Sequence, residues 1–159
     1  ADELEIPFVA SGGMADARSL VAAMALGAEG MNMGTRFIAT KDAPVHQNVK
    51  EAIVNASELD TRLIMRSLTN TERVLNNPAV ESLMAKEKAL GDDLTFEDIV
   101  DEVAGVYPKV MMEGEPEAGA WSCGMVAGLV NDIPSVEELI NTIMTEAEEI
   151  IVSKLQKAI

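Results

Sequence analysis

The chain has 159 residues, of which 48% are hydrophobic and 25% are charged, values typical of a folded globular protein rather than a disordered or fibrous one. Asp and Glu number 27 against 12 Lys and Arg, and the formal net charge of −15 disfavours nucleic acid as a partner. No apolar run approaches the roughly 20 residues of a membrane-spanning helix, and no signal-peptide pattern opens the chain. The single cysteine and single histidine predict neither a disulfide nor a metal site, and we expect a cytoplasmic protein without membrane contact.

The N-terminal stretch has the pattern of a buried strand that ends in a tight loop. Residues 6–10 are mainly apolar, and Ser11-Gly12-Gly13 follows at once. Ala15 to Leu26 is rich in Ala, Leu, Val and Met, with Gly27 just beyond it, which predicts a helix of about three turns. Since the chain begins at Ala1 rather than Met and soon reaches this strand, we expect a fragment.

A second strand and helical turn follow at once. Gly30 to Met33 reads as a short strand, Gly34-Thr35 turns the chain, and Arg36 to Ala39 predicts a helical turn. Alternation of strand and helix favours parallel strands covered by helices. Two parallel strands alone leave both edges exposed, so we expect this part of the chain to need partner strands.

Beyond Thr40 the sequence predicts a mainly helical region. We expect a helix at Gln47 to Ala56 and a brief extended stretch at Thr61 to Met65. Two hydroxyl residues followed three places later by an acid match capping boxes, at Thr95 and at Ser135, and each predicts a helix start. The helix after Ser135 has apolar residues at three- and four-residue spacing and places Lys154 and Lys157 in its last turn.

The two strand ends form the candidate phosphate site. Adjacent parallel strands joined by one helix bring their loops to the same edge, and loops of this kind in α/β barrels bind phosphate through backbone N–H groups. Glycine lets the backbone approach an anion closely, and small hydroxyl residues add donors. This reasoning gives Ser11, Gly12, Gly13, Gly34 and Thr35 as candidate phosphate-binding residues.

Three runs resemble the nitronate monooxygenase family, formerly called 2-nitropropane dioxygenases: residues 6–16, 25–28 and 32–40. Residues 63–68 and 121–129 are most similar to the branch described as NADH:quinone reductases. The resemblance covers most of the chain and is more specific at the two glycine loops than between Asn76 and Glu117.

The resemblance implies an FMN-dependent oxidoreductase whose fold is an α/β, eight-stranded TIM (β/α)8 barrel with an added helical domain. It places Gly12 and Gly13 on the family's first phosphate loop and residues 32–35 on its second. The candidate cofactor-binding residues are then Ser11, Gly12, Gly13, Asn32, Met33, Gly34 and Thr35. Residues 1–40 would supply the last two strand-helix units, and residues 41–159 a mainly helical extension whose C-terminal helix packs back on the barrel. NADH or NADPH would be a co-substrate, and the substrate a quinone or an alkyl nitronate. The N-terminal part of the same barrel would be the partner of this chain, with homodimerisation left open. No catalytic residue is assigned, because the family's catalytic groups lie upstream, and the fragment alone is expected to be inactive.

Two alternatives remain open at this point. A flavin-dependent enoyl-acyl-carrier-protein reductase has a similar barrel and similar phosphate loops. A non-catalytic helical interaction module would need the glycine loops only as turns.

Five other residue types have both a functional and a structural interpretation. His46 follows Ala43-Pro44-Val45 ahead of a helix, and Cys123 lies in an apolar run, so structural roles are favoured for both. Trp121 could reach a flavin, but we favour close packing around a helix at Gly124 to Gly128. The methionines are interpreted as core filling and the acidic clusters as solvated surface.

Overall fold

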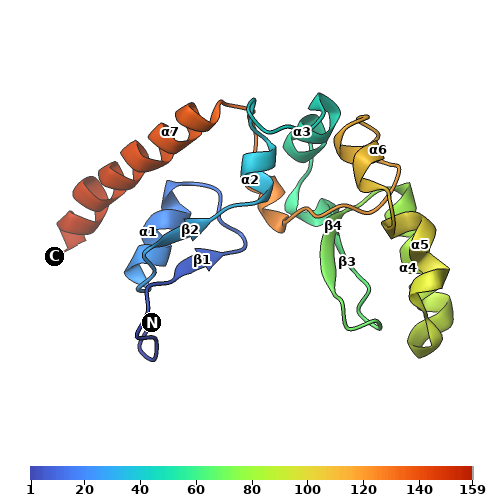
Figure 1. Ribbon diagram of the computed structural model, residues 1–159. Helices are drawn as coiled ribbons and strands as arrows, with labels where there is room; N and C mark the ends of the chain where they lie inside the picture. The colour runs from blue at the N-terminus through green and yellow to red at the C-terminus, as the bar shows by residue number, and fades with distance from the viewer. Residues whose placement is uncertain (159) are drawn as a thin grey trace.

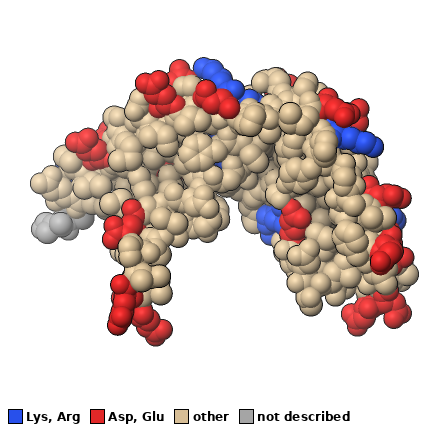
Figure 2. Space-filling model, in the orientation of Figure 1, with Lys and Arg blue, Asp and Glu red and all other residues tan. Residues whose placement is uncertain are grey.

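The computed structural model describes residues 1–158, which form two lobes joined by a short central helix (Figure 1). In chain order the principal elements are β1 (Val9–Ser11), α1 (Ala17–Ala25), β2 (Gly30–Asn32), α2 (Thr35–Ile38), α3 (Gln47–Val54), β3 (Thr61–Ile64), β4 (Glu72–Leu75), α4 (Pro78–Leu90), α5 (Phe96–Val103), α6 (Tyr107–Met111), a 3-10 helix (Met125–Leu129) and α7 (Val136–Glu149). The first lobe contains β1, α1, β2 and α7, the second contains α3 to α6 with β3 and β4, and α2 lies between them. The lobes stand on either side of a hollow, so that the molecule has the outline of an arch (Figure 2).

The first lobe is built on the predicted strand-helix-strand unit. β1 and β2 pair in parallel, with Val9 opposite Gly30 and Ser11 opposite Asn32, and α1 makes the connection between them. The predicted alternation is therefore confirmed, including the helical turn that follows Gly34. A parallel pair needs a crossover connection of a dozen or more residues, and residues 12–29, which include α1, are long enough to provide it.

The helix predicted after Ser135 is also confirmed, with one correction at its end. The Ser135 hydroxyl accepts from the N–H of Glu138 at 3.1 Å, and Glu138 accepts from the N–H of Ser135 at 2.7 Å, which completes the capping box. α7 ends at Glu149, so neither predicted lysine lies in the last turn of the α-helix. Lys154 lies in the π-helical segment that follows, and Lys157 lies in the 3-10 turn after it. Ala147 of α7 packs on Ala17 and Val21 of α1.

The second lobe contains an antiparallel hairpin in a region where we predicted mainly helix. β3 occupies the predicted extended stretch, but its partner β4 was not predicted. The segment after α6 runs beside β4, since the N–H of Leu75 donates to Trp121 O at 3.3 Å and the N–H of Cys123 donates to Arg73 O at 3.0 Å. This segment is therefore held along the hairpin like a short third strand.

Apolar side chains remain exposed on the first lobe. Ile6 is 70% exposed and Val9 is 59% exposed, although parallel sheets in proteins are normally covered on both faces. No helix within residues 1–158 combines the length and the apolar character that crossing a bilayer requires.

Candidate functional site

The two glycine loops leave the same edge of the β1–β2 pair. Ser11 and Asn32 are opposite each other at the ends of their strands, and the Asn32 side-chain amide donates to the Ser11 hydroxyl at 3.3 Å. Gly12 and Gly13 follow the first residue, and Met33 and Gly34 follow the second. Figure 1 shows both strands pointing with their C-terminal ends toward the hollow under α2. The predicted convergence of the loops is therefore what the structure shows.

The first loop has the backbone conformation that glycine allows. Gly12 has φ of +89° and Gly13 has φ of +73°, both in the left-handed region. A Cβ added at either position would meet no atom within 4 Å, so the main chain is open on that side. Among residues 1–158, no hydrogen bond from the N–H of Gly12 or Gly13 is present. The loop thus offers bare amide donors to an approaching anion.

The second loop has an open glycine flanked by two side chains that turn away from the loop surface. Gly34 also has space for an added Cβ. Met33 is 8% exposed and packs with Leu139 and Ile143 of α7, which leaves only its backbone to face a ligand. The Thr35 hydroxyl accepts a hydrogen bond from the N–H of Gly124 at 3.0 Å. The structure therefore brings Ser11, Gly12, Gly13, Asn32 and Gly34 together at the surface, and it gives Met33 and Thr35 supporting contacts.

The start of α1 is capped in part by side chains. The Asp16 carboxylate accepts from the N–H of Ser19 at 3.0 Å, and the Ser19 hydroxyl accepts from the N–H of Ala15 at 3.3 Å. Burial acts to raise the pKa of Asp16, but hydrogen bonds from Arg18 and Ser19 outweigh it and hold that pKa below its usual value. α2 is a single turn, too short to contribute much dipole. The two glycine loops supply amide donors at the ends of β1 and β2.

The arginine next to the second loop is committed to an internal ion pair. The Arg36 side chain is buried, and its Nη2 lies 2.6 Å from Asp132 Oδ1 while its Nη1 donates to Asp132 O at 3.1 Å. Figure 2 shows acidic side chains spread over the outside of the arch, with few on the sides of the hollow that are visible. An anion in the hollow would therefore be held by backbone dipoles rather than by Arg36.

Three residues with alternative functional interpretations have structural roles. Trp121 is fully buried and donates to Pro116 O at 2.9 Å, so it does not line a flavin mouth. Residues 125–129 form a short 3-10 helix rather than an α-helix. Gly128 packs so closely on Glu58 that a Cβ added at Gly128 would lie 2.8 Å from the backbone nitrogen of Glu58. His46 caps α3 by accepting from the N–H of Asn48 at 3.1 Å. Burial raises the pKa of the Cys123 thiol to about 11.

A hydrogen-bonded chain of three side chains was not predicted from the sequence. The Tyr107 hydroxyl donates to the Ser122 hydroxyl at 3.3 Å, and Ser122 donates to the Glu72 carboxylate. These residues come from α6, from the segment after Trp121 and from β4. Their separation along the chain follows no periodic pattern, so no local signal could have grouped them.

Known proteins match this chain over most of its length. One relative is a (3aS,4S,5R,7aS)-5-hydroxy-7a-methyl-1-oxo-octahydro-1H-indene-4-carboxyl-CoA dehydrogenase of Rhodococcus jostii. It is 31% identical to this chain in an alignment of 182 residues that covers 92% of this chain and 51% of that protein. A probable nitronate monooxygenase of Staphylococcus haemolyticus is 37% identical over 86 residues, covering 54% of this chain and 24% of that protein. FabK from Thermotoga maritima is 36% identical and superposes with a TM-score of 0.88 over 98% of this chain and 48% of that chain.

The chain spans about half the length of the Rhodococcus jostii relative and of FabK from Thermotoga maritima. The family model described as nitronate monooxygenase matches residues 1–146, a range that includes both glycine loops and the segment after Trp121. The resemblance inferred from those runs is confirmed: this chain belongs to the nitronate monooxygenase family.

Proposed function

We propose that this chain is the part of an FMN-dependent oxidoreductase that binds the cofactor phosphate. The observation that carries the proposal is the parallel register, in which Ser11 faces Asn32 and two glycine loops leave the same strand edge with open amides. A phosphate dianion suits such an arrangement, because backbone N–H groups supply positive dipoles without the desolvation cost of buried cations. Membership of the nitronate monooxygenase family supports the flavin assignment.

The residues present fit the cofactor. The N–H groups of Gly12, Gly13 and Gly34 would donate to phosphate oxygens, and Ser11 and Asn32 would add side-chain donors at the rim. Space beside all three glycines is open to a ligand. When bound, FMN would supply the hydride and electron chemistry, and the protein would position it. Thr35 and Met33 would fix the second loop from behind.

The exposed strands support a barrel architecture for the intact protein. β1 and β2 would be the last two strands of an eight-stranded barrel, with the remaining strands covering the apolar surface around Ile6 and Val9. Such a barrel would close one side of the hollow and exclude water from the flavin. The residues that face the flavin ring would come from the other strands, so the chain alone would not turn over.

The proposed reaction is electron transfer from NADH or NADPH to a quinone, with oxidation of an alkyl nitronate as the other activity named for this family. The test uses the intact polypeptide that contains this chain. Purified protein should show flavin absorbance, and acid extraction should release FMN. Stopped-flow mixing with NADH should bleach the flavin if the quinone reductase assignment is right. A yellow protein that NADH does not bleach but that consumes oxygen with propane-2-nitronate would support the nitronate activity instead.

A second candidate substrate class is an acyl thioester. The Rhodococcus jostii relative, which matches 92% of this chain, is described as a dehydrogenase of a carboxyl-CoA compound, whereas the Staphylococcus haemolyticus match covers 54%. Reoxidation of the reduced flavin by crotonyl-CoA, measured beside reoxidation by menadione, would decide between the two classes. Faster reoxidation by the thioester would replace the quinone assignment.

A further inference from the structure

The Tyr107, Ser122 and Glu72 side chains form a hydrogen-bonded chain with a fixed direction. Carboxylate oxygens only accept hydrogen bonds, so the Ser122 hydroxyl must donate to Glu72. The Ser122 oxygen is then available only as an acceptor, and the Tyr107 hydroxyl donates to it at 3.3 Å. The Tyr107 proton is therefore committed to Ser122, and the phenolic oxygen presents lone pairs outward. The free end of the chain is a hydrogen-bond acceptor.

This acceptor is tied to the proposed cofactor site through the backbone. Ser122 lies two residues before Gly124, a separation of about 7 Å in an extended chain. The N–H of Gly124 donates to Thr35 of the second glycine loop at 3.0 Å. The same segment is fastened to β4, because the N–H of Cys123 donates to Arg73 O at 3.0 Å. Ser122 is therefore held at a set position relative to the second loop and cannot drift independently of it.

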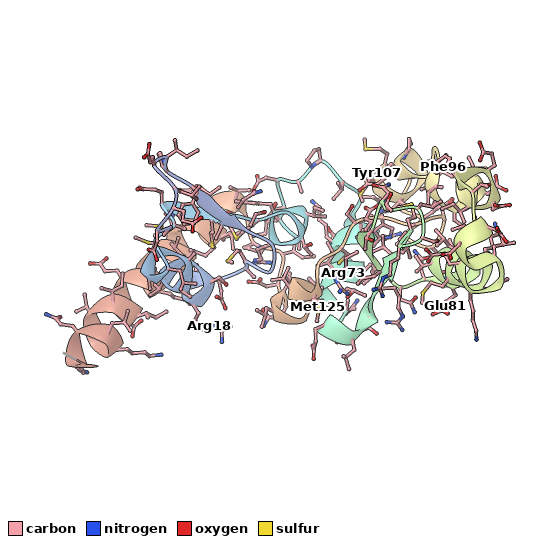
Figure 3. All side chains as sticks on the ribbon, turned by 90° about the horizontal axis from the view of Figure 1, so that it is seen from below. Arg18, Arg73, Glu81, Phe96, Tyr107 and Met125 are labelled. Atoms are coloured by element: carbon pink, nitrogen blue, oxygen red, sulfur yellow. The ribbon has the colours of Figure 1, made fainter. Side chains whose placement is uncertain are left out.

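The surface around Tyr107 is suited to cover by a ligand. The Tyr107 side chain is 48% exposed although its ring is apolar, and Phe96 is 49% exposed. Figure 3 shows both residues along one edge of the second lobe when the arch is seen from below, with Met125 on the other side of Arg73. An aromatic ring with one oriented polar atom is a common feature of small-molecule sites, where a few polar groups fix orientation on an apolar surface.

We propose that Tyr107 is a substrate-contact residue that accepts a hydrogen bond from an N–H or O–H group of the substrate, and that Ser122 and Glu72 are its positioning residues. The proposal rests on the proposed function and adds a specificity element to it. The donor on the substrate can be the carboxamide of a reduced nicotinamide or the amide of a pantetheine arm. Both share the same chemistry, a polarised hydrogen directed at the phenolic oxygen.

The test uses the intact, FMN-loaded protein with the variants Tyr107→Phe, Ser122→Ala and Glu72→Gln. Ser153→Ala serves as the matched control. Ser153 is a helical serine in the segment after α7, and within residues 1–158 its hydroxyl bonds only to the Glu149 carbonyl. Reduction by NADH and reoxidation by menadione or crotonyl-CoA are followed separately by stopped-flow absorbance. FMN affinity and melting temperature are measured for every variant.

Loss of one hydrogen bond should weaken apparent substrate binding by about fivefold to tenfold in Tyr107→Phe and Ser122→Ala, with FMN affinity unchanged. The double variant Tyr107→Phe/Ser122→Ala should bind substrate no more weakly than either single variant, because the effects of residues that act as a unit are not additive. A defect confined to the NADH step would identify the carboxamide as the donor, and a defect confined to reoxidation by crotonyl-CoA would identify the pantetheine amide. Reoxidation by menadione, which has no N–H or O–H group, should be unchanged. Either defect supports the proposal.

Equal kinetics in all variants and wild type, or a change in melting temperature alone, would overturn the substrate-contact role. Weakened FMN binding in step with the kinetic loss would do the same, because the chain would then act only on the cofactor loop. A wild-type protein that carries no flavin would remove the proposed function itself. The two failures are thus separated by the wild-type measurement.

Discussion

The backbone N–H of Gly124 donates a 3.0 Å hydrogen bond to the hydroxyl of Thr35, a residue 89 positions earlier in the chain. Thr35 belongs to the second glycine loop, and Gly124 belongs to the segment that runs along β4. The bond therefore joins the start of α2 to the segment beside β4, at the edge of the candidate site. Four predictions follow from this contact and from the groups around it.

Replacement of Thr35 by Val would leave the Gly124 N–H without its acceptor while keeping the side-chain volume. Because both residues are at least partly buried, we expect a loss of about 1–3 kcal/mol in the free energy of unfolding, together with weaker FMN binding. Thr35→Ser keeps the hydroxyl and should retain most of the wild-type stability and FMN affinity. Urea unfolding and flavin fluorescence titration measure the two effects. Equal behaviour of the Val and Ser variants would show that the bond does not support the loop.

Substitution at Gly34 tests the phosphate loop directly. Its φ of −97° suits any residue and an added Cβ meets nothing within 4 Å, so Gly34→Val should fold normally. The side chain would occupy the space proposed for a phosphate oxygen, and we expect FMN affinity to fall by about tenfold or more, equivalent to ~1.4 kcal/mol. Gly30→Ala is the matched control, because Gly30 lies at the other end of β2 and its Cβ would make ordinary contact with Val9. Unchanged FMN affinity in Gly34→Val would refute the proposed site.

The thiol of Cys123 should be inert in the native protein. Its side chain is 1% exposed, and burial raises its pKa to about 11, so little thiolate forms near neutral pH. We expect no reaction with Ellman's reagent under native conditions at pH 8 and one thiol per chain after unfolding in guanidinium chloride. Rapid native labelling would mean that the lobe around Cys123 opens.

The ion pair between Lys86 and Glu102 should make stability depend on acid pH. Lys86 Nζ lies 2.7 Å from Glu102 Oε1, and the Ser82 hydroxyl donates to the same oxygen at 2.8 Å. Burial acts to raise the pKa of Glu102, but the bonds from Lys86 and Ser82 outweigh it and lower that pKa below 4.5. A lowered pKa stabilises the folded state above the unfolded value, and this stability is lost as the pH falls through the folded value.

Glu102→Gln should therefore lower the free energy of unfolding at pH 7 by about 1–3 kcal/mol. The difference from wild type should shrink as the pH falls below about 4.5. Glu117→Gln, at an exposed position, is the control and should change stability little at either pH. Chemical unfolding at a series of pH values measures the difference, and a pH-independent effect of Glu102→Gln would contradict the ionic role.

Several local features were predictable from the sequence because their causes are local. The helix after Ser135 begins where a hydroxyl and an acid three residues later cap each other, and α1 lies between a loop and a glycine stop. The strand-helix-strand spacing predicted that the loops after Ser11 and Asn32 would leave the same edge, since a crossover helix makes the strands parallel. The family was also predictable, because its characteristic runs lie in these loops.

Other features depend on contacts between distant segments. β4 has no strong strand pattern of its own and is fixed by pairing with β3 and with the segment after Trp121. Lys154 was expected to end a regular α-helix, but the helix changes to a π turn after Glu149. Trp121 could have faced a flavin or the core by sequence alone, and its position was decided by the carbonyl of Pro116.

By itself, the sequence determined the family, the order of the main elements and the two loops of bare amides, because helix caps, glycine positions and strand-helix spacing act over a few residues. Only the tertiary structure decided that the Thr35 hydroxyl accepts from the Gly124 N–H and that Arg36 forms an ion pair with Asp132. It also decided that Tyr107, Ser122 and Glu72 form a hydrogen-bonded chain. The physical reason is that a hydrogen bond between residues far apart in the chain depends on how whole lobes pack, which no local pattern encodes.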